Sequence, residues 1–62
     1  MKYFIEVTTS SQGLKQLINL NNVNSFTELS SKTVILFNKN TTITVIESYE
    51  EIKQLIKQAT EL

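Results

Sequence analysis

The chain has 62 residues, and its six lysines balance six glutamates to give a formal net charge of zero. It lacks cysteine and histidine, which excludes disulfides, the usual zinc sites and nucleophilic triads built on either residue. A domain of this size buries only about 60% of its unfolded surface. We therefore expect a single domain over residues 1–62 that gains stability by oligomerisation.

The same composition argues against nucleic acid as the main partner. Nucleic-acid-binding proteins carry a basic excess, because phosphate neutralisation supplies most of their affinity. Arginine, which makes the best bidentate contacts to phosphate and guanine, is absent. The longest apolar run, Val34–Phe37, is far too short to span a membrane, and no secretory signal pattern is present. We expect a cytoplasmic protein without membrane insertion.

The first half of the chain predicts a hairpin. Lys2–Thr8 alternates apolar and polar residues and is rich in β-branched and aromatic side chains, which indicates a strand. Thr9–Gly13 is a turn cluster of hairpin length that holds the only glycine. Leu14–Leu20 is favoured as the return strand, although the spacing of its apolar residues also fits a short helix over Gly13–Leu20.

The next segments predict further strands separated by asparagine-rich turns. Asn21 and Asn22 should form a tight turn or bulge, since asparagine tolerates positive φ. Weak alternation over Val23–Leu29 and strong β propensity over Thr33–Phe37 indicate two strands, joined by the turn at 30–32. The three residues 38–40 are expected to form a hairpin turn with asparagine in the left-handed position, leading into the strand Thr41–Ile46.

The C-terminal segment Glu47–Leu62 predicts a helix. Ser48 followed by Glu51 is a capping box, in which each side chain bonds the other residue's backbone N–H. The apolar residues after it fall on one stripe at helical spacing. They are Ile52, Leu55, Ile56, Ala59 and Leu62.

Together these elements predict an α+β fold, an antiparallel meander of four to five strands with the C-terminal helix packed on one face. The strands carry apolar residues on both faces. Phe4, Val34, Leu36 and Ile46 point away from the face that the helix would cover. One helix, about 21 Å long at the standard rise per residue, cannot cover both sides. Either the Leu14–Leu29 segment curls over the second face, or another subunit covers it.

No residue pattern indicates catalysis or cofactor binding. Most of the serines lie in turn clusters, where serine is common. Glu47, Glu50 and Glu51 gather at the predicted helix start, where they complement the helix dipole and complete the cap. We therefore expect a protein that is not an enzyme and that has no catalytic residue, metal site or cofactor.

From Leu17 onward the chain resembles the FlbD-like family of small flagellar and swarming-motility proteins, and similar short phage and mobile-element proteins. The resemblance rests on Asn19–Val23, Thr33–Leu36, Asn38–Asn40 and Val45–Ile52, although the usual turn glycine is missing. It implies a non-enzymatic regulatory protein and assigns no binding residue.

The sequence thus predicts a non-catalytic regulatory or adaptor protein that acts through protein–protein interaction. We expect a homodimer or higher homo-oligomer formed through the second sheet face or an edge strand, with a further protein partner as an option. The expected interface residues are Phe4, Phe26, Val34 and Leu36. The alternative is a nucleic-acid-binding regulator that uses the sheet. Its contacts would be Lys2, Lys15, Lys32, Lys39 and Phe4.

Overall fold

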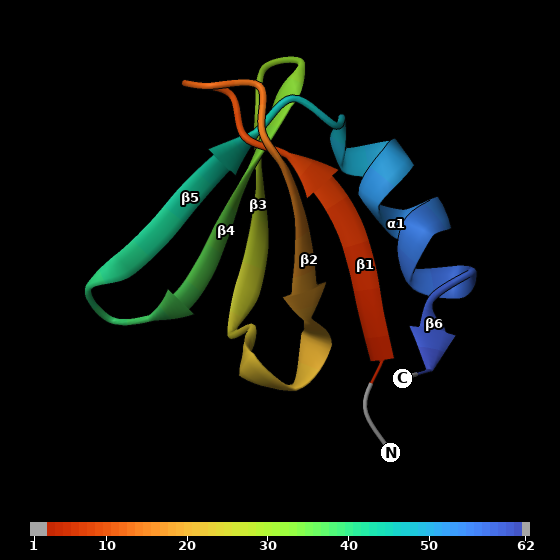
Figure 1. Ribbon diagram of the computed structural model, residues 1–62. Helices are drawn as coiled ribbons and strands as arrows, with labels where there is room; N and C mark the ends of the chain where they lie inside the picture. The colour runs from red at the N-terminus through yellow and green to blue at the C-terminus, as the bar shows by residue number, and fades with distance from the viewer. Residues whose placement is uncertain (1–2, 62) are drawn as a thin grey trace.

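The computed structural model describes residues 3–61, which form a small α+β fold with one C-terminal α-helix (Figure 1). This fold class is as predicted. The elements in chain order are β1 (Tyr3–Thr8), β2 (Lys15–Asn19), the 3-10 helix η1 (Leu20–Asn22), β3 (Ser25–Leu29), β4 (Lys32–Asn38), β5 (Thr41–Val45), α1 (Tyr49–Lys57) and β6 (Thr60–Glu61). The predicted return strand Leu14–Leu20 is therefore confirmed over Lys15–Asn19, and the alternative of a helix over Gly13–Leu20 is wrong, although Leu20 itself begins η1.

The strands form two antiparallel sheets rather than one continuous meander. β1 pairs with β2 on one edge and with the short β6 on the other. β3, β4 and β5 form the second sheet, in that order. The two sheets separate because the chain leaves β2 through η1 instead of a hairpin turn. The Asn19 Oδ1 accepts the Asn21 N–H at 3.0 Å, which stabilises this tight helical turn.

The tight turn expected at Asn21 and Asn22 forms as η1, but neither these asparagines nor those in the turn at 38–40 adopt the positive φ that was expected. Among residues 3–61, the only non-glycine residue with positive φ is Ser30, at 53°, in the turn between β3 and β4. The turn between β4 and β5 is instead closed by Asn38, whose Oδ1 accepts the Asn40 N–H at 3.0 Å. A register shift between Leu36 and Asn38 supplies the bend that a left-handed residue would otherwise provide.

The two sheets are joined where β1 and β5 end. The Ile46 N–H donates to the Thr8 carbonyl at 2.9 Å, and the Ser10 N–H donates to the Thr44 carbonyl at 2.9 Å. The Thr8 N–H donates in turn to the Glu47 carboxylate at 2.9 Å. These bonds hold the ends of β1 and β5 together, while the other ends of the two strands fan apart (Figure 1).

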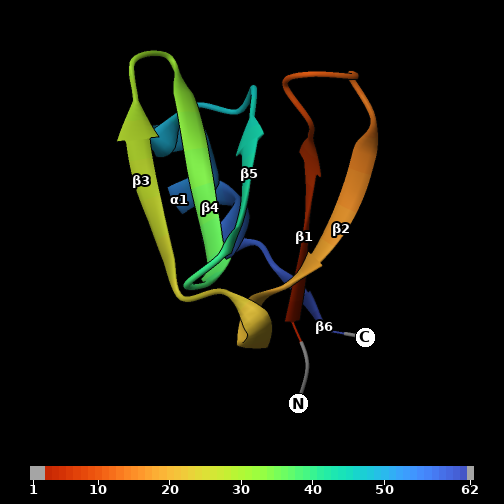
Figure 2. The ribbon, with the colours of Figure 1, turned by 90° about the vertical axis from the view of Figure 1, so that its left-hand side faces the viewer.

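A single apolar core lies between the inner faces of the two sheets and α1. Its buried members come from both sheets and from the helix. They are Ile5, Val7, Ile18, Ile35, Val45 and Ile52. Half-buried residues complete it, including Leu20 in η1, Val23 directly after η1 and Phe37 on β4. The helix thus packs on one face of the β3–β4–β5 sheet, as predicted, and stands behind that sheet in Figure 2.

The helix is shorter than the sequence indicates. It begins at the predicted capping box, with both reciprocal bonds formed between Ser48 and Glu51, but it ends at Lys57. The chain then turns back so that β6 can pair with the free edge of β1, which satisfies more backbone groups than a frayed helix end would. Leu62, the last residue of the predicted apolar stripe, lies outside the described residues. No helix within residues 3–61 is long and apolar enough to cross a membrane.

The core position of Ile52 gives a direct test of this packing. Ile52 is 1% exposed, whereas Ile56, one turn later, is 40% exposed. We expect Ile52→Ala to lower the free energy of unfolding by about 2–5 kcal/mol, because it opens a cavity in the only core of the described fold. Ile56→Ala is the matched control and should cost less than about 1 kcal/mol. Urea denaturation followed by circular dichroism measures both, and equal losses would contradict the assigned helix face.

Candidate functional site

The outer face of the β3–β4–β5 sheet lies on the side opposite α1 and the core. The strand register determines which residues lie on this face. Val34 lies between Thr27 and Thr44, and Leu36 lies between Ser25 and Thr42. We call these six residues the outer face. The view in Figure 2 looks toward this side of the sheet, with the helix behind it.

The outer face has an apolar centre and hydroxyl-bearing flanks. Val34 and Leu36 occupy the central strand and are half-buried by their neighbours within the sheet. Serine and threonine side chains fill the flanking positions on β3 and β5. None of the six side chains carries a charge. Such a strip is typical of the centre of an interface, where charge is depleted and apolar side chains are enriched.

The four interface residues predicted from sequence do not all lie on this surface. Val34 and Leu36 lie side by side on the outer face, as alternation requires. Phe26 pairs with Ile35 on the opposite, inner face and packs against the core. Phe4 belongs to the other sheet, where it pairs with Asn19 and is half-buried. The predicted set therefore separates into one pair and two isolated residues.

Sequence reasoning did not single out Leu29 as part of this surface. It is 52% exposed and follows Thr27 on the outer side of β3, opposite Lys32. Ile46, 50% exposed, continues the same side just after β5. Because side chains alternate along β3, Leu29 lies on the other face of the strand from Phe26. This alternation could have identified Leu29 from the sequence. These two side chains extend the apolar strip at the end where the sheets join.

Lys32 lies two residues before Val34 on the same side of β4, as the cross-strand partner of Leu29. It donates to the Ser10 hydroxyl at 2.7 Å, which directs the cation toward the turn between β1 and β2. Both groups are exposed. The bond therefore places the charge at the end of the outer face and away from Val34 and Leu36.

Other exposed apolar side chains lie on different parts of the surface. Leu17, 58% exposed, is on the outer side of β2 opposite Glu6. Tyr3 and Ile56 border a shallow depression near η1 that also includes Leu20. These positions are separate from the outer face, because they belong to the β1–β2 sheet and to α1.

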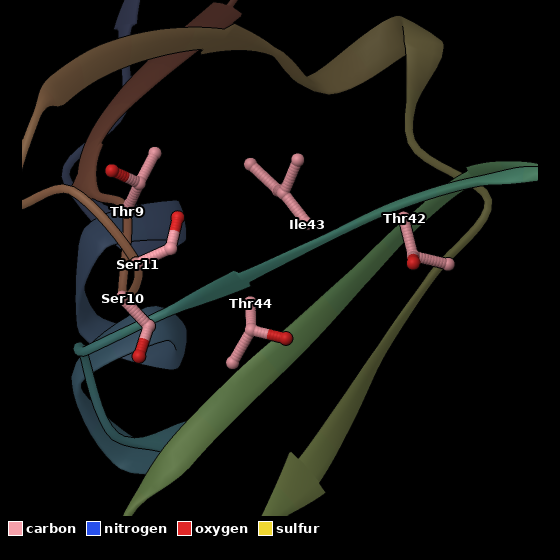
Figure 3. Close-up of a pocket in the computed structure, with 6 residues that line it drawn as sticks. All are labelled: Thr9, Ser10, Ser11, Thr42, Ile43 and Thr44. Atoms are coloured by element: carbon pink, nitrogen blue, oxygen red, sulfur yellow. The ribbon is translucent and has the colours of Figure 1, made fainter.

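A second depression lies between β5 and the turn that joins β1 to β2 (Figure 3). Its lining consists of Thr9, Ser10, Ser11, Thr42, Ile43 and Thr44. In Figure 3 the side chains of Thr42 and Thr44 point to one side of β5, whereas Ile43 points to the other side, which it shares with Thr9. The lining has hydroxyls and one aliphatic side chain but no ionisable group. It offers hydrogen bonds without a general base to activate a hydroxyl.

Three glutamates border a depression between β1 and α1, but two of them hold structural hydrogen bonds. The Glu47 carboxylate accepts the Thr8 N–H, and the Glu51 carboxylate accepts the Ser48 N–H at 2.8 Å. Glu6 is the third and is exposed. Within residues 3–61, no three acidic, histidine or cysteine side chains are arranged to hold a metal ion. Glu47 therefore joins β1 to the segment before α1, and Glu51 caps the start of α1.

The lysines named for the nucleic-acid alternative do not gather on one surface. Lys15 and Lys32 lie near the turn between β1 and β2, since Lys15 pairs with Thr8 and Lys32 bonds Ser10. Lys39 is at the opposite end of β4. Lys2 lies outside the described residues.

Known proteins offer no relative from which the role of this surface could be inferred. No family model matches the chain, and no curated protein or solved structure is similar to it.

The segment that leads from β5 into α1 depends on a buried hydroxyl. The Thr33 side chain is fully buried and donates to the Glu47 carbonyl at 2.9 Å. Thr33→Val keeps the shape but removes the donor, so we expect a loss of about 1–3 kcal/mol in the free energy of unfolding. Lys32→Met removes the neighbouring exposed hydrogen bond and should change stability by less than about 0.5 kcal/mol. Thermal and urea unfolding measure both, and a larger loss in the lysine variant would contradict this assignment.

Proposed function

We propose that this protein is a non-catalytic regulatory or adaptor protein that acts through protein–protein contacts and associates with itself. The observation that carries the proposal is the uncovered outer face, with Val34 and Leu36 at its centre and Leu29 and Ile46 at its end. A small chain gains stability by removing such a surface from water, at about 25 cal/mol per Å² of apolar area.

The position of the core supports the same proposal. The helix and the Leu20–Val23 connection pack on the inner side of the β3–β4–β5 sheet, so neither reaches the outer face. Contiguous exposed apolar surface on a soluble domain commonly marks an interaction site. The fold has one core, and a second protein surface is the simplest cover for the other side of the sheet.

A regulatory role fits the chemistry of the depressions better than an enzymatic one. The β5 depression is lined by hydroxyls, and the Glu47 and Glu51 carboxylates bordering the α1 depression are engaged in holding the fold. The resemblance of the strand–turn–strand–capped-helix segment to FlbD-like proteins agrees with a regulatory protein of the cytoplasm. Protein partners other than a second copy would bind to surfaces that the assembly leaves exposed.

The mass in solution tests self-association directly. Light scattering across a concentration series should give a mass that rises with concentration from the chain mass of 7.1 kDa toward twice that value. The rise should persist at high salt, because burial of apolar surface is not screened by ions. A mass that stays at 7.1 kDa up to millimolar concentration would overturn the proposal.

A further inference from the structure

We propose that the outer face packs against the same face of a second copy across a two-fold axis, which gives a four-layered homodimer with the two helices outermost. This inference rests on the proposed self-association and adds the surface and the symmetry. It assigns the contact to Val34 and Leu36 and to the hydroxyls beside them, and it leaves the β1–β2 sheet outside the interface.

Charge is the first reason for choosing a second copy as the occupant. A two-fold interface places a patch against itself, so any charge within the patch meets a like charge nearby. The six outer-face side chains carry no charge of either sign. Lys32, on the same side of β4 at the end of the face, donates to Ser10. The six central positions can therefore meet their own copies without electrostatic repulsion.

The hydroxyl flanks are the second reason. Serine and threonine hydroxyls both donate and accept hydrogen bonds. When the central strands of two copies face each other, the angle between the two sheets decides which flanks meet. The β3 flank of one copy lies near either the β5 flank or the β3 flank of the other copy. Thr27 and Thr44 can pair in either arrangement, so the flanks are complementary to themselves. A face flanked by amines or carboxylates would lack this property.

The neighbouring edge of β5 offers a poorer contact than the face. Ser10 and Ile46 already hydrogen-bond across this edge, to Thr44 and Thr8 respectively. The turn between β1 and β2 therefore blocks one end of β5 against a new strand. This occupation favours packing through the face over extension of the sheet at β5.

The size of the face sets the expected strength of the dimer. Three strands spaced about 4.8 Å apart and about six residues long cover about 300 Å². A standard stable interface buries about 800 Å² on each partner. Even with Leu29 and Ile46 included, a contact of this size falls below the standard range, among weak and transient interfaces. The dimer is therefore reversible, and its population depends on protein concentration.

Leu36→Lys tests the surface, and Leu17→Lys is its matched control. Both substitutions place one ammonium in the middle of a strand on the outer side of a sheet, and Leu17 is the more exposed of the two residues, at 58%. We expect Leu36→Lys to raise the dimer dissociation constant at least about tenfold, because the two-fold axis brings two desolvated ammonium groups together. Leu17→Lys should leave the constant within about twofold. Sedimentation equilibrium measures both, with circular dichroism as the check on folding.

Two further measurements test the same face if Leu36→Lys unfolds. Thr27→Lys changes an exposed side chain of the same face and should weaken the dimer without loss of the fold. Mixing Leu36→Lys with Leu36→Glu should restore a dimer that neither chain forms alone, since opposite charges then meet across the axis. A wild-type monomer would overturn the proposed function itself. A wild-type dimer that survives Leu36→Lys and Thr27→Lys, or that is lost in Leu17→Lys, would overturn only the assignment of this face.

Discussion

The fold depends on the backbone of Thr8 at the end of β1. Its carbonyl accepts the Ile46 N–H, and its N–H donates to the Glu47 carboxylate, both at 2.9 Å. Through these two bonds one residue ties the first sheet to the end of β5 and to the segment that begins the helix. Because Glu47 directly precedes the capping box, the same contact sets where α1 starts. The buried Thr33 hydroxyl holds the Glu47 carbonyl from the other sheet.

This junction determines which surfaces are buried and which remain open. It brings the inner faces of the two sheets toward each other at one end, and α1 fills the space between them with Ile52. A core built in this way has a single interior. The opposite side of the β3–β4–β5 sheet is left outside it, although its central strand is apolar on both faces. The surplus apolar surface of β4 is the physical basis for proposing an assembly, since none of the described elements packs on that side of the sheet.

Local sequence patterns predicted the elements that rest on near-neighbour interactions. The capping box at Ser48 and Glu51 needs only residues three positions apart, and it formed as expected. Alternation correctly divided β4 into the core residue Ile35 and the outward pair Val34 and Leu36. Alternation also placed Phe26 on the face opposite Leu29, but it could not say which of these faces is turned toward the core. The mixed set of predicted interface residues arose from that ambiguity.

Residue types and their spacing alone determined the α+β class, the strand faces and the start of the helix, because these follow from backbone period and local hydrogen bonding. Only the tertiary structure decided that the strands divide into two sheets, that the helix ends at Lys57, and that the outer face is left without a cover. Each of these depends on partners far apart in sequence. The Asn19–Asn21 contact diverts the chain after β2, and the free edge of β1 draws the C-terminal residues into β6. Such competition between a local pattern and a distant backbone partner is settled by the free energy of the whole fold.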